Sequence, residues 1–257
     1  DAVNMTENQS GRARMSSIAS TRILLEEGVE PIMQMTCRDR NRIAMQSDLL
    51  GAAALGMENV LCLTGDHQRF GDNPEAKGVF DLDSVQLIAT VAQLNSGYLL
   101  SGKEMKKAPQ FLIGAAANPF AEPFEMRVIR LHKKIEAGAH FIQTQPVFDL
   151  ELFTRWMEKV VEAGLHEQCA IFAGVMPVRS VRALLYMKDN VPGMKINGGY
   201  VERMENATDP KEEGVGIAVE IISELKNITG VRGIHLLPVM WESIVPTLVK
   251  EAELIEN

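Results

Sequence analysis

Short apolar runs alternate with longer amphipathic stretches along the whole chain. The apolar runs predict buried strands, and stretches with apolar residues at three- and four-residue spacing predict helices. We expect strands over 2–5, 31–36, 59–63, 111–115, 140–144, 170–173 and 234–237. We expect helices over 12–27, 42–55, 84–94, 125–137, 150–163, 180–187, 210–227 and 241–255, and an irregular segment or short helix over 191–207.

The repeated order of strand and helix indicates a parallel sheet, because parallel strands need long crossover connections that are usually helical. An open doubly wound sheet and a closed barrel both fit this order. A nucleotide-binding open sheet would carry GxGxxG after its first strand, and the segment Asn8-Gln9-Ser10-Gly11 does not match it. Polar clusters follow nearly every expected strand, and in a barrel those strand ends meet on one face. The pattern therefore favours an α/β fold of the (β/α)8 TIM-barrel class.

The expected strands fall one short of a barrel. We expect seven strands, whereas a (β/α)8 barrel has eight. Either residues 194–196 form the eighth strand, or the first strand lies upstream of Asp1. The chain opens on an expected strand without Met, which favours the second explanation. We therefore expect residues 1–257 to form a single barrel domain that is N-terminally incomplete and lacks its first strand.

Composition narrows the class of protein. Hydrophobic residues make up 46% and charged residues 23% of the chain, as in ordinary globular proteins. The net charge of −8 argues against nucleic-acid binding, since phosphate contacts need clustered Lys and Arg. Three cysteines without a CxxC pair fit a reducing cytoplasm and argue against a zinc site. The sequence has neither an apolar run of membrane-spanning length nor a signal peptide at its polar start.

Two polar clusters are candidates for ligand binding, and each has a structural alternative. Residues 36–42 place three arginines and an aspartate in a strand-to-helix turn. They could hold a phosphate or carboxylate, or they could form a salt-bridge network at the helix start. Asp66 follows Gly65, which permits close approach of a ligand. Its carboxylate could accept a hydrogen bond from a heterocycle, or it could cap a turn.

Other candidates are single residues. Gln145, at the end of an expected strand, could read the amide-like edge of a ring or could be a buried amide. Lys133 and Lys134 lie near the end of an expected helix, where compensation of the helix dipole explains them. The five histidines have no metal-ligand spacing, so no metal site is expected.

Five segments, in this order, resemble the methylenetetrahydrofolate reductase family: PIMQMTCRDRNR (31–42), ENVLCLTGD (58–66), AAANPFAEP (115–123), KKIEAGAHFIQTQPVFD (133–149) and FAGVMPV (172–178). The resemblance implies a cytoplasmic, homo-oligomeric enzyme with a flavin, FAD or alternatively FMN, in a single barrel domain. It also implies reduction of 5,10-methylenetetrahydrofolate to 5-methyltetrahydrofolate. The hydride would come through the flavin from NAD(P)H or from a partner electron donor.

The resemblance also implies roles for individual residues. Asp66 matches the family's catalytic aspartate near the flavin, which also hydrogen-bonds the pterin. Gln145 and Phe148 match substrate contacts. The positions that hold the flavin and its phosphates match Thr6, Gln34, Gly65, Asp66, Asn118, Glu122, Lys133 and Lys134.

The sequence departs from the family's pattern at several positions. Gln34 stands where the best-known bacterial members have His, Thr64 replaces an Arg before Gly-Asp, and Trp241 replaces a substrate-binding Arg. The family's general acid is a Glu on the first strand, so we expect this proton donor outside the chain rather than at Glu7. Two alternative functions are a pterin-binding methyltransferase barrel without flavin and a subunit of an electron-transfer complex that works with a zinc-binding partner protein.

Overall fold

The computed structural model describes residues 1–191 and 193–255, and the chain forms two compact units. Unit 1 comprises Asp1–Ala116 and Lys133–Phe141. Unit 2 comprises Ala117–His132 and the residues from Ile142 onward. The chain therefore passes from one unit to the other three times, and each unit is described by itself.

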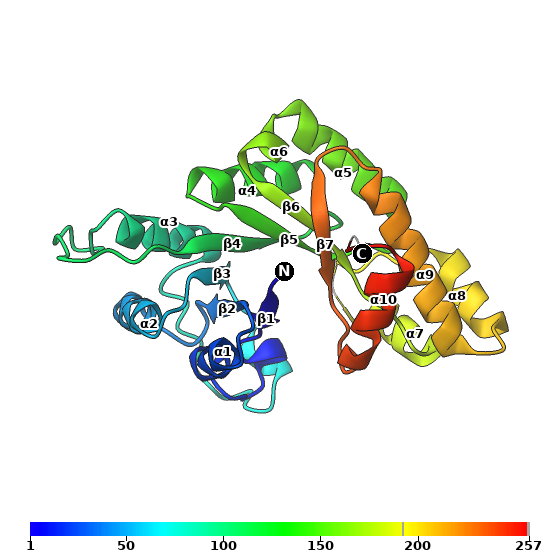
Figure 1. Cartoon of the computed structure of the whole chain (residues 1–257), viewed down its shortest axis with the longest axis horizontal. Coiled ribbons are helices and arrows are strands. Elements are labelled where there is room, and N and C mark those ends of the chain that lie inside the picture. The colour runs from blue at the N-terminus through cyan, green and yellow to red at the C-terminus, as the bar shows by residue number, and fades with distance from the viewer. Residues whose placement is uncertain (192, 256–257) are drawn as a thin grey trace. The chain divides into compact units, whose positions relative to one another are not determined.

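Unit 1 is built on parallel strands that are neighbours in sequence order (Figure 1). Its strands are β1 (Val3–Met5), β2 (Pro31–Thr36), β3 (Asn59–Leu63) and most of β4 (Leu112–Ala117). Its helices are α1 (Ser17–Glu26), α2 (Arg42–Ala54), α3 (Ser84–Asn95) and the short 3-10 helices η1 (Gln9–Gly11) and η2 (Gln68–Phe70). Helix α4 (Glu125–Glu136) begins in unit 2 and ends in unit 1.

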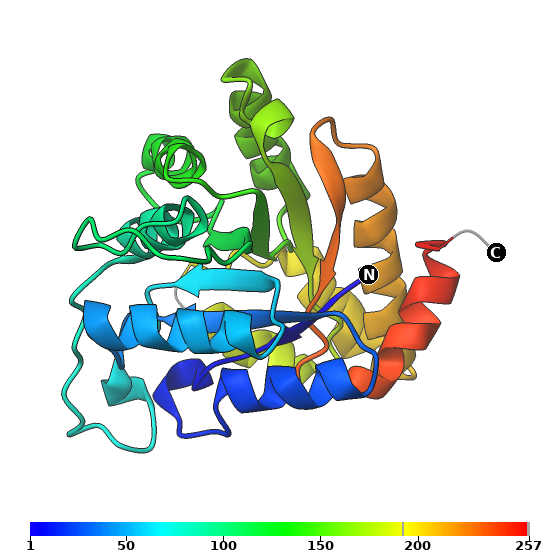
Figure 2. The ribbon, with the colours of Figure 1, turned by 60° about the vertical axis from the view of Figure 1, so that its left-hand side comes forward.

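Unit 2 continues the alternation of strand and helix. Its strands are most of β5 (Phe141–Pro146), β6 (Ala170–Val175) and β7 (Val231–Leu236), and β7 pairs parallel to β6. Its helices are α5 (Leu150–Glu162), α6 (Leu165–Gln168), α7 (Val181–Asn190), α8 (Gly198–Asn206), α9 (Pro210–Lys226), the 3-10 helix η3 (Glu242–Ile244) and α10 (Val245–Glu251). Figure 2 shows α9 beside β7, against which it packs.

The core positions follow from the hydrophobic pattern. A parallel strand is covered on both faces, so it reads as an almost continuous apolar run. Val60 and Leu61, which lie on opposite faces of β3, are both buried. Helix α5 buries one stripe at three- and four-residue spacing, with Phe153, Trp156 and Val160 fully inaccessible. Parallel strands in sequence order, each followed by a helix, confirm the predicted (β/α)-barrel class. The described residues hold seven strands.

The first helix is shorter than the sequence pattern predicts. We expected a helix over 12–27, but α1 begins only at Ser17, after the side chain of Ser16 accepts a hydrogen bond from Ala19 N. The preceding backbone is engaged elsewhere, because Ala13 N donates to Asp72 Oδ1 and Arg14 N donates to Asn8 Oδ1. These tertiary hydrogen bonds compete successfully with helix formation.

Other boundaries also differ. Strands β4 and β5 each end two residues later than expected, and β7 begins three residues earlier. The expected helix over 241–255 is a 3-10 turn followed by the shorter α10, and α6 was not expected. Helix α8 occupies much of the segment expected to be irregular or a short helix. Of the two explanations for the missing strand, an eighth strand over 194–196 is wrong, because the pairing described there is an isolated bridge from Ile196 to Phe148.

We expect the burial of His235 on β7 to make the stability of the fold sensitive to acid. Burial lowers its pKa from 6.5 to about 4. In the unfolded chain the imidazole of His235 is protonated below about pH 6.5, whereas in the folded chain it stays neutral down to about pH 4. The free energy of unfolding therefore falls as the pH falls from 6.5 to 4. We expect a loss of about 3 kcal/mol from this group by pH 4. Urea unfolding at pH 7 and pH 4.5 measures the loss.

The matched variants are His235→Gln, which cannot acquire a charge, and His132→Gln on the exposed part of α4. The first should lose part of the acid sensitivity of unfolding, and the second should keep it. Equal acid sensitivity in both variants would exclude His235 as the group responsible.

Candidate functional site

The carboxyl ends of β1, β2 and β3 lie side by side in unit 1, because these strands are parallel neighbours. Each end runs into a polar segment. Thr6 to Asn8 follow β1, Cys37 to Asn41 follow β2, and Thr64 to His67 follow β3. The structure therefore brings together the two polar clusters that the sequence singled out.

The arginines of residues 36–42 are all paired with carboxylates. Arg38 makes two hydrogen bonds to Asp39, at 2.8 and 2.7 Å. Arg42 pairs with Asp81 at 2.9 Å, and the hydrogen bonds from Arg42 lower the pKa of Asp81 to about 2. Of the two interpretations left open by the sequence, the salt-bridge network is the one that the structure supports.

Arg40 belongs to a buried part of this network. It donates to Glu7 Oε1 at 2.7 Å and to Asp48 Oδ2 at 2.6 Å. Burial by itself would lower the pKa of Arg40, but the hydrogen bonds and charges of Glu7 and Asp48 raise it above its usual value. The guanidinium therefore keeps its charge and ties the end of β1 to α2.

Glu7 is one of the most enclosed charged residues described, with 3% of its surface exposed. Its Oε2 accepts hydrogen bonds from Thr36 N at 2.6 Å and Thr36 Oγ1 at 3.1 Å. Its Oε1 accepts from Ser17 Oγ at 3.2 Å in addition to Arg40. This carboxylate joins the end of β1, the end of β2 and the start of α1. Its role could not be predicted from sequence, because nothing in the order of residues shows that it is buried.

Asp66 is exposed at the carboxyl end of β3. Its Oδ2 accepts a hydrogen bond from Ser10 N at 3.1 Å, and its backbone oxygen accepts one from Arg38 at 3.0 Å. Gly65 has φ +89°, and a Cβ there would lie 3.1 Å from Thr36 Cβ. Glycine is thus required both by the backbone conformation and by the close packing against β2. This turn presents the Asp66 carboxylate to solvent from a fixed backbone.

The remaining predicted site residues of unit 1 differ in their exposure and in their hydrogen bonds. Thr6 and Lys133 are exposed, and Gln34 is half-buried on β2. Lys134 donates to the backbone oxygen of Ala116 at 2.5 Å. Its amine therefore fastens the end of α4 to β4, which goes beyond the simple dipole compensation considered from the sequence.

The predicted residues of unit 2 follow β4 and β5. Asn118 Oδ1 accepts a hydrogen bond from Phe120 N at 2.9 Å, and Glu122 Oε2 accepts one from Phe124 N at 3.1 Å. Gln145 is exposed on β5, whereas Gln143, two residues earlier on the same face, is only 7% exposed. Gln145 is therefore not the buried amide of the structural alternative.

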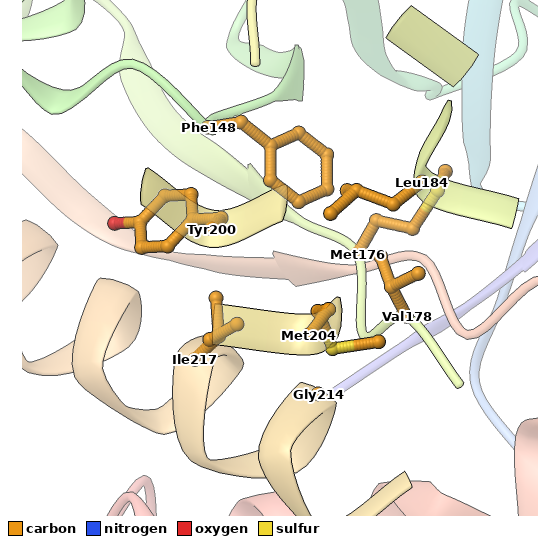
Figure 3. Close-up of a pocket in the computed structure, with 8 residues that line it drawn as sticks. All are labelled: Phe148, Met176, Val178, Leu184, Tyr200, Met204, Gly214 and Ile217. Atoms are coloured by element: carbon orange, nitrogen blue, oxygen red, sulfur yellow. The ribbon is translucent and has the colours of Figure 1, made fainter. Parts of the chain in front are cut away.

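Phe148 lies in apolar packing, with 1% of its surface exposed. It lines a cavity of about 10 Å³ in unit 2, which holds no more than about one water. The eight lining residues, shown in Figure 3, are Phe148, Met176, Val178, Leu184, Tyr200, Met204, Gly214 and Ile217. The ring contacts protein side chains here, and its contact with a substrate stays a prediction.

Other chemistries find little support among the described residues. Within 1–191 and 193–255, no group of three or more His, Cys, Asp or Glu side chains could hold a metal ion. Burial raises the pKa of the Cys37 and Cys169 thiols to about 12, which makes them poor nucleophiles. No helix in the described part of the chain is long and apolar enough to cross a membrane.

Repeated parallel β/α units with polar residues after the strands define a protein of the (β/α)-barrel class, in which active sites lie on the carboxyl-terminal face. The family model of methylenetetrahydrofolate reductase matches residues 1–253, so the chain belongs to this family. This agrees with the resemblance found in the sequence.

Individual relatives agree with the family match. Methylenetetrahydrofolate reductase 1 of Schizosaccharomyces pombe is 25% identical over 239 residues, which cover 89% of this chain and 36% of that protein. A probable methylenetetrahydrofolate reductase (NADH) of rice, Oryza sativa, is 25% identical over 236 residues, which cover 89% of this chain and 39% of that protein. The chain thus spans less than half the length of these relatives.

The fold is also found in a solved structure. It is a protein of Clostridium thermocellum described as binding two copies of 5-methyl-5,6,7,8-tetrahydrofolic acid. Its TM-score is 0.59 at 14% sequence identity, and the match covers 91% of this chain and 75% of that protein. At this identity the likeness supports the fold class alone.

Proposed function

We propose that this protein reduces 5,10-methylenetetrahydrofolate to 5-methyltetrahydrofolate with a bound flavin. The family match over residues 1–253 carries the proposal. The exposed Asp66 carboxylate at the end of β3, where the family's catalytic aspartate is expected, agrees with it. The Clostridium thermocellum protein, which shares the fold, is described as binding 5-methyl-5,6,7,8-tetrahydrofolic acid, so a folate ligand is compatible with this fold.

The residues present fit a flavin. Thr6 offers an exposed hydroxyl and Lys133 an exposed amine, while Gln34 and Asn118 offer amides that are only partly covered. We propose that these residues, with Gly65, Asp66, Glu122 and Lys134, hold the ring and the phosphates of FAD, with FMN as the alternative. When bound, a flavin supplies the ability to take up a hydride from one substrate and deliver it to a second.

We propose that residues 1–257 form a single flavin-binding domain. The chain alternates between the two units rather than completing one before starting the other. This interleaving is the reason for proposing one domain instead of two.

Asp66 would bind and orient the pterin. One of its oxygens already accepts the Ser10 N–H, and Oδ1 accepts no hydrogen bond from the described residues. A pterin carries N–H and amino donors that match this oxygen, and the negative charge would stabilise cationic iminium character in the folate. Gln145, exposed on β5, would hydrogen-bond the substrate from a second strand.

We propose that the proton that opens the methylene bridge comes from a group other than Glu7. Glu7 is 3% exposed and accepts hydrogen bonds from Thr36, Ser17 and Arg40. A carboxylate enclosed in this way has no access to a substrate.

The electron donor has two candidates, NAD(P)H and a partner protein. The rice relative is named for NADH, which favours a pyridine nucleotide. A zinc-binding partner subunit that delivers electrons is the second candidate. We place the enzyme in the cytoplasm as a homo-oligomer, and the three free, buried cysteines agree with a reducing compartment.

The absorption spectrum of the purified protein tests the cofactor. We expect the two bands of an oxidised flavin, which bleach on anaerobic addition of NADH or NADPH and return with 5,10-methylenetetrahydrofolate. Mass spectrometry of the released cofactor distinguishes FAD from FMN.

Two other outcomes would each contradict one part of the proposed function. A colourless protein that still binds folate would favour the methyltransferase alternative. If neither NADH nor NADPH bleaches the flavin absorption, but a reduced partner protein does, the result would favour the electron-transfer subunit.

A further inference from the structure

Arg38 is a buried cation whose hydrogen bonds reach three strand ends at once. Its side chain is 3% exposed. A charge buried to this degree is stable only when it is paired and hydrogen-bonded. Asp39 supplies the charge, and the two hydrogen bonds between them raise the pKa of Arg38 above its usual value.

The remaining donors of Arg38 go to backbone oxygens of the two neighbouring loops. One nitrogen donates to the oxygen of Asp66 after β3, at 3.0 Å, and another donates to the oxygen of Asn8 after β1, at 3.2 Å. Arg38 itself follows β2. The planar fork of a guanidinium is suited to such a junction, because its donors point in fixed directions.

The loop after β1 closes the arrangement. Ser10 N donates to the Asp66 carboxylate at 3.1 Å, so Arg38 and this loop hold Asp66 by its backbone and by its side chain. Asn8 and Ser10 adopt positive φ values of 41° and 57°. A residue other than glycine holds this conformation at a cost, and it persists where its surroundings enforce it. Asn8 is held here by hydrogen bonds with Arg38, Asp39 and the backbone N of Arg14, and Ser10 is held by its hydrogen bond to Asp66.

We propose that Arg38 is the positioning residue for Asp66, acting on folate binding through the loop over residues 8–10. It touches no substrate itself. It fixes the backbone of Asp66 and, through Asn8, the Ser10 N–H that orients the carboxylate. This inference rests on the proposed function, since it takes Asp66 to be a residue that binds folate.

The test is a double-mutant cycle on folate binding. Calorimetry with 5-methyltetrahydrofolate gives the affinity of the original protein and of the variants Arg38→Lys, Asp66→Asn and both together. Lys keeps the charge but cannot make the same set of hydrogen bonds. We expect each single variant to bind about 10-fold more weakly, and the double variant to bind about as weakly as Asp66→Asn alone, because the two residues act as one unit.

Arg42→Lys is the matched control, since Arg42 lies in the same turn and pairs with Asp81 rather than with Asp66. It should bind folate like the original protein. If Arg38→Lys also binds like the original protein, or if the losses of the cycle simply add, the inference is wrong while the proposed function stands. If the original protein itself does not bind the folate, the proposed function is wrong, and this inference with it.

Hydrogen exchange of the ligand-free protein provides a second readout. In Arg38→Lys, the amides of residues 8–12 should exchange faster, with little change in the strands. If this variant does not fold, Asp39→Asn replaces it, because it weakens the support of Arg38 and leaves the arginine in place. Unchanged exchange in the loop of a folded variant would overturn the inference.

Discussion

Replacing Asp66 by Asn is expected to lower the rate of 5,10-methylenetetrahydrofolate reduction by about 100-fold. The change keeps the shape of the side chain and removes its charge. The amide cannot stabilise cationic character in the folate, and it can present a donor where the pterin also has one. Oxidation of the electron donor with an artificial acceptor should change much less, because that reaction does not need the pterin.

The matched control for this variant is Asp72→Asn. Asp72 is also an exposed carboxylate after β3, and it also accepts a backbone N–H from the loop after β1, that of Ala13, at 3.2 Å. Its replacement should leave the rate of folate reduction nearly unchanged. Steady-state rates at saturating folate measure both variants. Equal rates for Asp66→Asn and the original protein would exclude the assigned role of Asp66.

Replacing Arg40 by Met is expected to lower the free energy of unfolding by about 3–5 kcal/mol. The loss arises because Glu7, 1% of whose side chain is exposed, then keeps a buried charge without its cationic partner. Urea unfolding at neutral pH measures the effect. Removing both charges, with Glu7→Gln added to Arg40→Met, should cost less than Arg40→Met alone, since no uncompensated charge then remains buried. Asp48, the other partner of Arg40, also loses its ion pair, but its side chain is 37% exposed and water can solvate it.

Arg42→Met provides the comparison within the same turn. The Arg42–Asp81 pair has side chains that are 54% and 30% exposed, so water screens it and its loss should change stability little. A loss in Arg40→Met no larger than that in Arg42→Met would show that the buried pair contributes no more than an exposed one.

Much of the fold could be predicted from the hydrophobic pattern. Strands β2 and β3 have the predicted boundaries, because parallel strands buried on both faces read as unbroken apolar runs. Helix α1 could not be delimited in this way. Its first expected turn is drawn into hydrogen bonds with Asn8 and Asp72, and the partner Asp72 lies far along the chain.

The candidate site was predictable only in part. The position of Asp66 followed from its place after a strand and a glycine, and the structure exposes it at the end of β3. The roles of Glu7 and Arg38 did not follow, because a charged residue in a polar stretch looks the same whether it is buried or exposed. Gln145 and Phe148 are separated by two residues, yet the first is exposed and the second is buried.

The sequence by itself determined the class of fold, the order and type of the main elements and the family, because these depend on local periodicity and on short motifs. The tertiary structure decided which charges of residues 36–42 are partners and which side chain supports Asp66. Those partners come from the ends of different strands, and parallel pairing places them beside each other only after the chain has folded. A pairwise hydrogen bond such as that from Arg38 to Asp66 leaves no periodic trace in the sequence.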